Sequence, residues 1–338
     1  MTRSNDLANI GPGYQTGNRN ILINGDMKIR QRATLTTTTN SYQYTADRWW
    51  VFSGAATVGA PIYSTTTTLP GFFNILRVGR QGSNTGVGAI AVGQTIESIN
   101  VYPLQGKTVT LSFWARSGVN FSSASSALLT QITQGTGIDQ GVLGSINQTW
   151  TGFNSTTIGT ATLNLTWQKF NYTYSVPLTA TELNVQFLYI PTGTAGANDW
   201  FDITGVQLEL GSVPTPFEYR PIGQELALCQ RYTYRISGPA GNPHFALGSA
   251  ASTAIVYIPI RFPVTMRGVQ SSTTVTSSAV AVSDFTAANT GGTITTNPLW
   301  NTPESCLVQY NSSGLTTYRP YAITFTANTG FLQFDAEL

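Results

Sequence analysis

The chain has 338 residues and a formal net charge of +2, and only 9% of its residues are charged, against roughly 25% in an average globular protein. Hydrophobic residues make up 41%, which is enough to bury a substantial core and excludes a disordered tail. The scarcity of charged helix formers excludes a helical bundle or a coiled coil. The small net charge, without a basic cluster, excludes a nucleic-acid binder of the usual phosphate-gripping kind.

The first 19 residues form a polar segment interrupted by Gly11, Pro12 and Gly13. Such a segment cannot build a hydrophobic core of its own, so we expect residues 1–19 to be an arm that docks on a partner. The N-terminus has no apolar signal core, and the chain has no run of about 18 apolar residues. We therefore expect neither secretion through a signal peptide nor insertion into a membrane.

Strands are predicted from Asn20 onward, because apolar and polar residues alternate there. In one such run, Val109, Leu111 and Phe113 share a face while the residues between them are polar or face the other way. Strands at this spacing, separated by turn residues, are typical of an antiparallel sandwich. The clearest alternating runs are residues 107–116, 167–176, 183–189 and 201–210.

The periodicity changes at residues 221–231, where Ile222, Leu226 and Cys229 recur at helical spacing behind Pro221. This pattern predicts one short helix, after which strand patterns resume. Residues 271–289 are rich in Ser, Thr and Ala and fit either exposed strands or a long loop. The predicted fold is all-β, a jelly-roll sandwich followed by a short helix and a second β-sandwich domain. The expected boundaries are an N-terminal docking arm at 1–19, a jelly roll at 20–218, a helical connector at 219–237 and a C-terminal β domain at 238–338.

Catalytic motifs are missing from the sequence. The single histidine, His244, lies in a Gly/Pro-rich segment, and no G-x-S-x-G elbow accompanies it. A glycosidase needs two carboxylates about 5 to 10 Å apart, and sequence context singles out no pair among the 15 acids. Cys229 and Cys306 have no CxxC spacing, which argues against a zinc site. We therefore expect a protein that is not an enzyme.

Tryptophans are the candidate ligand-binding residues, because sugar rings stack an apolar face on indole. Trp49 and Trp50 are adjacent in a predicted strand and must point to opposite faces, so one of them should be exposed or covered by a neighbouring subunit. Trp114 lies opposite the apolar face of its own strand. We take Trp49, Trp50 and Trp114 as candidate glycan-binding residues, with core packing as the alternative for each.

Three motifs follow one another along the chain. They are NILINGDM at 20–27 with YTADRW at 44–49, TVTLSFWARS at 108–117, and WFDITGVQLELG at 200–211 continuing to PFEYRP at 216–221 and ELALCQRY at 225–232. In this order they resemble a group of tailed-bacteriophage virion proteins of the tail-fibre, minor structural or decoration type. The resemblance implies location in the virion, attachment to other virion proteins through residues 1–19, and a homotrimer.

Three functions are compatible with that resemblance. The preferred one is a tail-fibre or tail-associated adhesin that contacts host surface polysaccharide. The second is a capsid decoration or cement protein that stabilises the head, and the third is a glycan-degrading enzyme. A cement protein would bind capsids, whereas an adhesin would adsorb to host cells or to their purified polysaccharide.

The first domain is also similar to the jelly-roll carbohydrate-binding modules attached to glycanases, which begin with an Asn-Gly-Asp-Phe-Glu-like segment. Those modules often hold a structural calcium through acids near both ends of the domain, and Asp26 and Asp202 occupy the matching places. Lys28 stands where the family tends to have glutamate, and a cation in a ligand position disfavours Ca²⁺. The resemblance thus implies glycan binding, with a calcium site at Asp26 and Asp202 as its only suggested cofactor.

Overall fold

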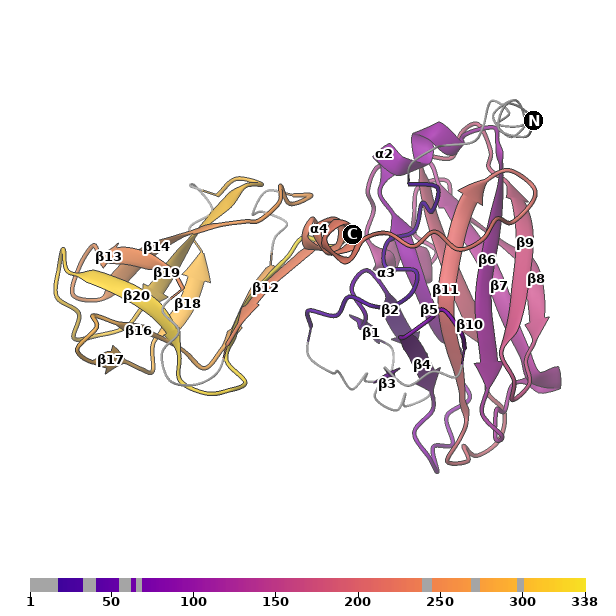
Figure 1. Ribbon diagram of the computed structural model, residues 1–338, viewed down its shortest axis with the longest axis horizontal. Helices are drawn as coiled ribbons and strands as arrows, with labels where there is room; N and C mark the ends of the chain where they lie inside the picture. Colours follow the sequence, from indigo (N-terminus) through magenta and orange to yellow (C-terminus); the bar gives the residue numbers. More distant parts are fainter. Residues whose placement is uncertain are drawn as a thin grey trace, which may run out of the picture. The chain divides into compact units, whose positions relative to one another are not determined.

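The computed structural model describes residues 18–32, 41–54, 62–64, 69–238, 245–268, 274–296 and 301–338. The chain divides into two compact units, one of residues 1–221 together with Leu338, and one of residues 222–337 (Figure 1). The division falls inside the segment that the sequence assigns to a helical connector. Of the helices within the described ranges, none has the length and apolar character needed to cross a membrane.

Two antiparallel sheets make up the first unit, which confirms the sandwich that the alternating runs predict. One has six strands in the order β1 (Ser41–Tyr44), β2 (Trp50–Ser53), β5 (Ile90–Ile96), β10 (Glu182–Tyr189), β7 (Ala127–Gly135) and β8 (Asn154–Thr162). The other has five in the order β3 (Ile62–Ser64), β4 (Ile75–Gly79), β11 (Trp200–Leu210), β6 (Thr108–Ser117) and β9 (Gln168–Ser175). Strands distant in sequence pair in both sheets, as in a jelly roll.

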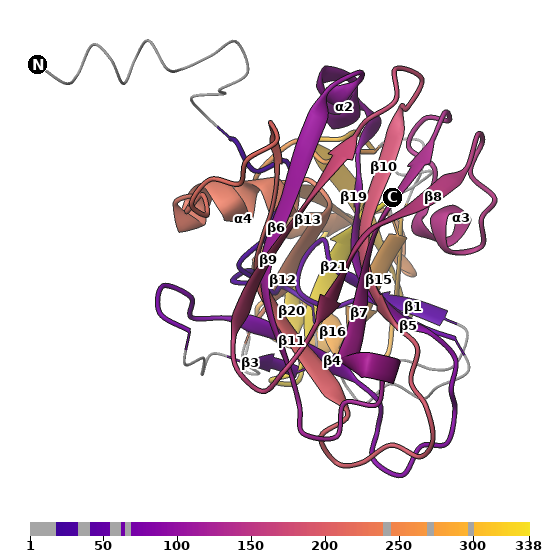
Figure 2. The ribbon, with the colours of Figure 1, turned by 90° about the vertical axis from the view of Figure 1, so that its right-hand side faces the viewer.

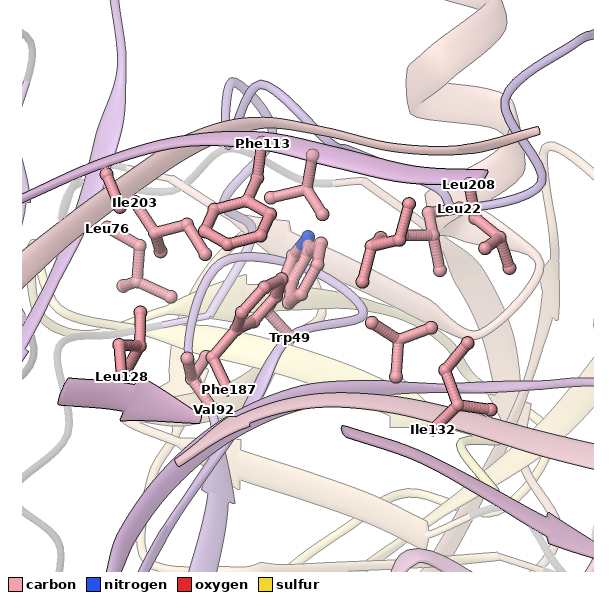
Figure 3. Close-up of a cluster of buried hydrophobic side chains, with 14 of the residues drawn as sticks. Leu22, Trp49, Leu76, Val92, Phe113, Leu128, Ile132, Phe187, Ile203 and Leu208 are labelled. Atoms are coloured by element: carbon pink, nitrogen blue, oxygen red, sulfur yellow. The ribbon is translucent and has the colours of Figure 1, made fainter. Parts of the chain in front are cut away.

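The core of the first unit lies between these two sheets (Figure 3). Phe113 of β6 and Phe187 of β10 meet there with ring centroids 4.6 Å apart, in an edge-to-face contact. Trp49, which directly precedes β2, is fully buried in the same cluster. Because every second residue of these strands enters the core, the residues between them form the outer face of each sheet.

Short helices lie in the connections between strands of the first unit. α2 (Ser98–Val101) and a 3₁₀ turn (Tyr102–Leu104) follow β5, and a second 3₁₀ turn (Ala124–Ser126) precedes β7. α3 (Val142–Ile146) lies beside the strands of the six-stranded sheet (Figure 2). It is held against the outer face of that sheet, where the Asn184 side-chain amide of β10 donates to the Ser145 hydroxyl at 3.0 Å. This helix therefore covers one part of that face.

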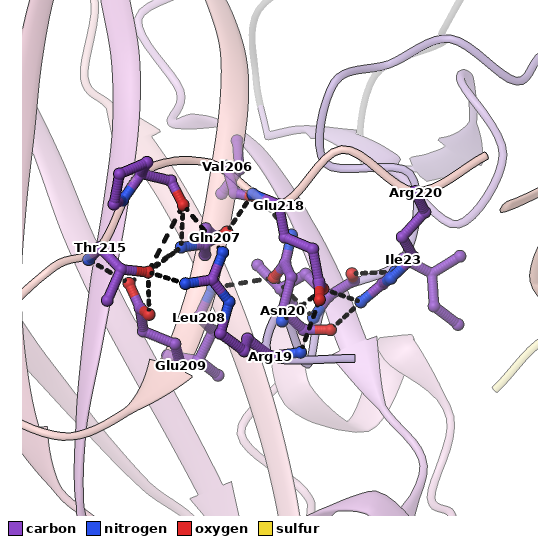
Figure 4. A network of polar contacts seen from close by, with 12 residues as sticks. Arg19, Asn20, Ile23, Val206, Gln207, Leu208, Glu209, Thr215, Glu218 and Arg220 are labelled. Carbon is purple, nitrogen blue, oxygen red and sulfur yellow. Dashed lines mark hydrogen bonds and ion pairs between the residues drawn. The ribbon is translucent and has the colours of Figure 1, made fainter. Parts of the chain in front are cut away.

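A polar network joins the N-terminal segment to the last strand of the jelly roll (Figure 4). The Asn20 side-chain oxygen accepts the backbone N–H of Leu22 at 3.1 Å and of Leu208 at 3.0 Å. The Glu218 carboxylate accepts the backbone N–H groups of Arg19 and Asn20 at 3.0 and 2.9 Å. Arg19, which the sequence assigns to the arm, is thus held by the jelly roll. Residues 1–17 of the expected arm lie outside the described residues.

The second unit begins with α4 (Ile222–Gln230), which confirms the predicted helix. β12 (Thr233–Ser237), placed by sequence in the connector, pairs with β21 and belongs to this unit. Within the stretch 271–289, the described residues 274–289 contain three strands, which excludes a long loop, but the strand at 280–283 is largely buried and not exposed as expected. The sheet orders are β12–β21 (Phe331–Asp335)–β15 (Thr274–Ser278), and β17 (Ala288–Asn289)–β16 (Val280–Ser283)–β20 (Pro320–Phe325)–β13 (Leu247–Ala250)–β14 (Ile255–Arg261)–β19 (Ser305–Asn311)–β18 (Thr293–Thr296).

A single hydrophobic cluster joins the two sheets of the second unit. Leu332 and Phe334 of the three-stranded sheet belong to the same buried cluster as Ile258 and Val308 of the seven-stranded sheet. The second unit is therefore a β-sandwich as well, as the sequence predicts. Cys306 of β19 is buried in this cluster.

Candidate functional site

A groove of about 350 Å³ lies on the outer face of the six-stranded sheet. The alternation of β10 explains its position, because Val185 and Phe187 point into the core while Gln186 and Leu188 point outward into the groove. Its lining comes from β2, β5, β10, β7 and β8 and from the segment around α3. The lining residues are Phe52, Ala89, Ala91, Gln131, Thr133, Ser145, Ile146, Gln148, Phe153, Ser155, Gln186 and Leu188.

The polar floor of the groove is a chain of side-chain hydrogen bonds that crosses neighbouring strands. Asn184 donates to the Gln186 oxygen at 3.2 Å, and Gln186 donates to the oxygen of Gln131, its direct partner on β7, at 2.6 Å. Gln131 donates in turn to the Thr157 hydroxyl at 3.1 Å on β8. Each bond fixes which way an amide points, so the floor offers oriented donors and acceptors.

Further hydroxyl contacts extend this floor on either side. The Thr133 hydroxyl donates to the Ser155 hydroxyl at 3.1 Å, across β7 and β8. On the opposite side, the Thr95 hydroxyl of β5 donates to the Asn184 oxygen at 3.3 Å. The part of this row that lines the groove therefore spans β10, β7 and β8, while Asn184 and Thr95 are buried behind it. A row of this kind suits a ligand whose polar groups repeat along its length.

The apolar part of the groove rests on a buried indole. Trp50 of β2 clusters with Ala91 and Val142, and the half-buried Phe52, Ile146 and Leu188 pack against that cluster. Gly93, the direct partner of Trp50 on β5, leaves room for the ring, because a Cβ there would lie 2.4 Å from an atom of the indole. Phe52, Ile146 and Leu188 therefore form a well-supported apolar wall at this end of the groove.

The groove carries no formal charge, since its lining residues are all uncharged. Glu182, on the same face of β10, is buried and its carboxylate accepts the backbone N–H of Gln140. Burial raises the pKa of Glu182 above its usual range, and the nearby charge of Asp139 adds to that rise. The site can therefore select a ligand by hydrogen bonds and apolar contact, without ion pairing.

Trp49 and Trp50 are fully buried, and neither offers a ring face to a ligand. They point to opposite faces as alternation requires: Trp49 enters the core and donates to the Asn24 carbonyl oxygen at 2.9 Å, while Trp50 lies on the outer face. The expectation that one of them must be exposed or covered by another subunit needs correction. Val142 and its neighbours around α3 cover Trp50 within the same chain.

Trp114 is half-buried on the outer face of the five-stranded sheet, between its direct partners Thr204 of β11 and Lys169 of β9. The structure therefore places it on a different sheet from the groove. A carbon of its ring would meet a Cβ at Gly205 at 3.1 Å, and Gly205 has φ +60° at the irregularity of β11. The three candidate tryptophans thus do not form one site.

The calcium candidates Asp26 and Asp202 are each paired with cations. Asp202 is fully buried and receives two bonds from Arg77, at 2.7 and 3.0 Å, and one from Arg116 at 2.9 Å. Asp26 lies 3.3 Å from the Lys28 ammonium, and its other oxygen is buried without a hydrogen-bond partner. Within the described ranges, three or more metal-binding side chains nowhere gather into a metal site. These residues therefore do not fit Ca²⁺, which needs six to eight oxygen ligands.

The sequence alone does not single out the groove residues. Their only signal is that Asn184 and Gln186 occupy the polar positions of an otherwise apolar run, as does Gln131 on β7. Polar residues at such positions are ordinary for a solvated sheet face. What distinguishes them is their pairing across strands, and that depends on register rather than on sequence spacing.

Neither a family model nor a curated protein matches the chain. Among solved structures, a carbohydrate-binding module described under "CBM4 structure and function" is 19% identical, with a TM-score of 0.33, over 56% of this chain and 98% of that one. The CBM22-1 xylan-binding domain of Paenibacillus barcinonensis Xyn10C is 12% identical, with a TM-score of 0.31, over 53% and 99%. The enzymatically active domain of bacteriophage CBA120 tailspike protein 4 is 18% identical, with a TM-score of 0.34, over 57% and 22%.

Proposed function

We propose that the first unit binds a neutral polysaccharide in the groove on the six-stranded sheet. The observation that carries this proposal is the pair Gln186–Gln131, which the buried Asn184 orients from behind and which lies beside an apolar wall in a lining without charge. Sugars match this chemistry, because their hydroxyls both donate and accept hydrogen bonds while their C–H faces pack on apolar side chains. A volume of about 350 Å³ accommodates a short stretch of such a chain.

Binding without hydrolysis is part of the proposal. Hydrolysis of a glycosidic bond generally needs one carboxyl group as an acid and a second as a base or nucleophile. The twelve residues that line the groove include neither Asp nor Glu nor His. The groove therefore has the means to hold a saccharide but lacks acid–base groups to cleave it.

The biological role that we propose is that of an adhesin in the tail or fibre of a bacteriophage, which recognises polysaccharide on the host surface. The resemblance of the motifs between residues 20 and 232 to those of tailed-phage virion proteins supports this role. A homotrimer attached to the virion through residues 1–19 would present several grooves at once. Several weak sites acting together adsorb a particle far more tightly than one site does.

Replacing Gln186 by alanine tests the groove. The variant loses the donor to Gln131 and the acceptor of Asn184, so we expect affinity for the host polysaccharide to fall about tenfold, or about 1.4 kcal/mol. The side chain is half-buried, and we expect the melting temperature to change little. Affinity electrophoresis in gels containing the purified polysaccharide measures binding, and thermal unfolding measures stability.

Gln81→Ala serves as the matched control, because Gln81 is exposed and does not line the groove. Its retention should equal that of the unmodified protein. Unchanged retention of Gln186→Ala would refute the groove as the binding site. If the unmodified chain fails to bind host polysaccharide but binds purified capsids, the adhesin role is wrong and the capsid cement role takes its place.

A further inference from the structure

The outer face of the five-stranded sheet carries a cationic cluster that the groove does not use. Arg77 of β4 and Arg116 of β6 flank Asp202 of β11, and each is its direct partner in the strand register. Asp202 is fully enclosed, whereas the two arginine side chains remain 26% and 21% exposed. A ligand approaching this face therefore meets guanidinium groups and not the carboxylate beneath them.

Indole rings hold these guanidinium groups in place. Arg77 lies 3.4 Å from the centroid of the Trp200 ring, and Arg116 lies 4.9 Å from that of Trp167 and 5.9 Å from that of Trp200. Trp200 and Trp167 are themselves half-buried. Cations and indole rings thus alternate on this face from Arg77 of β4 through Trp200 of β11 and Arg116 of β6 to Trp167, which directly precedes β9.

Positive charge exceeds negative charge in this cluster. Lys169 of β9 is exposed and is the direct partner of Trp114, which places it diagonally from Arg116 on the same face. The Cα atoms of such diagonal neighbours lie about 7–8 Å apart. Arg77, Arg116 and Lys169 supply three positive charges and Asp202 one negative charge, so the cluster carries +2. The groove on the other sheet is neutral, so the two faces suit ligands of different charge.

We propose that this face is a second binding site, which takes an acidic polysaccharide whose sugars carry carboxylates. A carboxylate accepts charge-assisted hydrogen bonds on both oxygens, so the partly exposed guanidinium of Arg116 and the ammonium of the exposed Lys169 on the same face are the groups that would hold it. The ring that bears it packs against a neighbouring indole. The site is independent of the groove, because its charge and its residues belong to the opposite sheet.

Lys169→Gln and Arg116→Gln test this site, with polygalacturonate as the acidic probe and dextran as the neutral one. Removing Lys169 should weaken binding of polygalacturonate about threefold and removing Arg116 about tenfold, with both effects reduced at high salt. Lys107→Gln is the matched control, because it removes an exposed lysine outside the cluster. Isothermal titration of the full chain measures binding, and thermal unfolding reports whether Arg116→Gln remains folded.

Each outcome of this experiment supports or overturns the proposal. Weakened binding in Lys169→Gln with a normal melting temperature, and not in Lys107→Gln or Gln186→Ala, supports it. Equal binding of polyglutamate, which has carboxylates but no sugar ring, overturns it in favour of simple charge attraction. Absence of polygalacturonate binding, or a change in self-association alone, also overturns it. Binding of dextran or of the host polysaccharide in the groove is a separate result, which tests the proposed function and not this second site.

Discussion

Replacing Arg80 by leucine is expected to lower the free energy of unfolding by about 3–5 kcal/mol. The side chains of Arg80 and Asp199 are both fully buried, and the Arg80 Nε lies 2.7 Å from a carboxylate oxygen of Asp199. Without the guanidinium, that carboxylate is a buried charge without a cation, which is far more costly than a missing surface pair. Urea unfolding at neutral pH measures the loss.

Arg80 also connects loops that close one end of the jelly roll. Its guanidinium donates to the carbonyl oxygens of Gly86 and Gly193, both at 2.8 Å, and to the hydroxyl of Ser122 at 3.0 Å. Asp199 accepts the backbone N–H of Ser122 at 3.0 Å. The pair therefore fixes three connections at once, each far from the others in sequence.

The double variant Arg80→Leu/Asp199→Leu is the control for this explanation. If the isolated carboxylate causes the loss, the double variant should recover part of the stability, because the buried charge is gone. A double variant less stable than Arg80→Leu by the full cost of Asp199→Leu would show that the loop contacts dominate. A loss below about 1 kcal/mol in Arg80→Leu would contradict the buried-pair explanation altogether.

The sheets of the sandwich could be predicted from sequence because alternation follows directly from burial. Val109, Leu111 and Phe113 enter the core, as their spacing indicates. The helix near 221–231 was also predictable, since α4 is the one long departure from that alternation in the described chain. In both cases the signal is local: a run of residues records which face meets the core.

The covering of Trp50 could not be predicted, because α3 gives little local signal. Val142–Ile146 includes Gly144 and is five residues long, so nothing in its sequence marks it as a helix or as a lid. Its function becomes visible only when the chain brings it onto the outer face of β2 and β5. Alternation correctly separated Trp49 from Trp50 but could not tell what lies over the second ring.

The two candidate sites could not be predicted from the sequence for the same reason. Gln131 and Gln186 are distant in sequence and meet only because β7 and β10 pair in one register. The resemblance to carbohydrate-binding modules implies a calcium role for Asp202, whereas the strand register gives it two arginine partners, Arg77 and Arg116. Polar pairs across strands depend on the fold, and a single sequence records no trace of them.

Replacing Trp49 and Trp50 by alanine, one at a time, should separate the core from the groove. Trp49→Ala removes a fully buried ring from between the sheets and should cost about 3–5 kcal/mol. For a unit of this size the melting temperature should fall on the order of 10 °C. Affinity for the host polysaccharide, measured well below that temperature, should be unchanged, because Trp49 does not support the groove.

Trp50→Ala should lower both stability and affinity. The ring supports the apolar wall of the groove from below, and Ile146 and Leu188 of that wall pack against its cluster. A cavity under the wall lets these side chains and α3 shift, so the contacts with a saccharide weaken even while the protein is folded. We expect a stability loss similar to that of Trp49→Ala together with about tenfold weaker binding. Normal affinity in Trp50→Ala, or weakened affinity in Trp49→Ala alone, would mean that the saccharide does not lie against this wall.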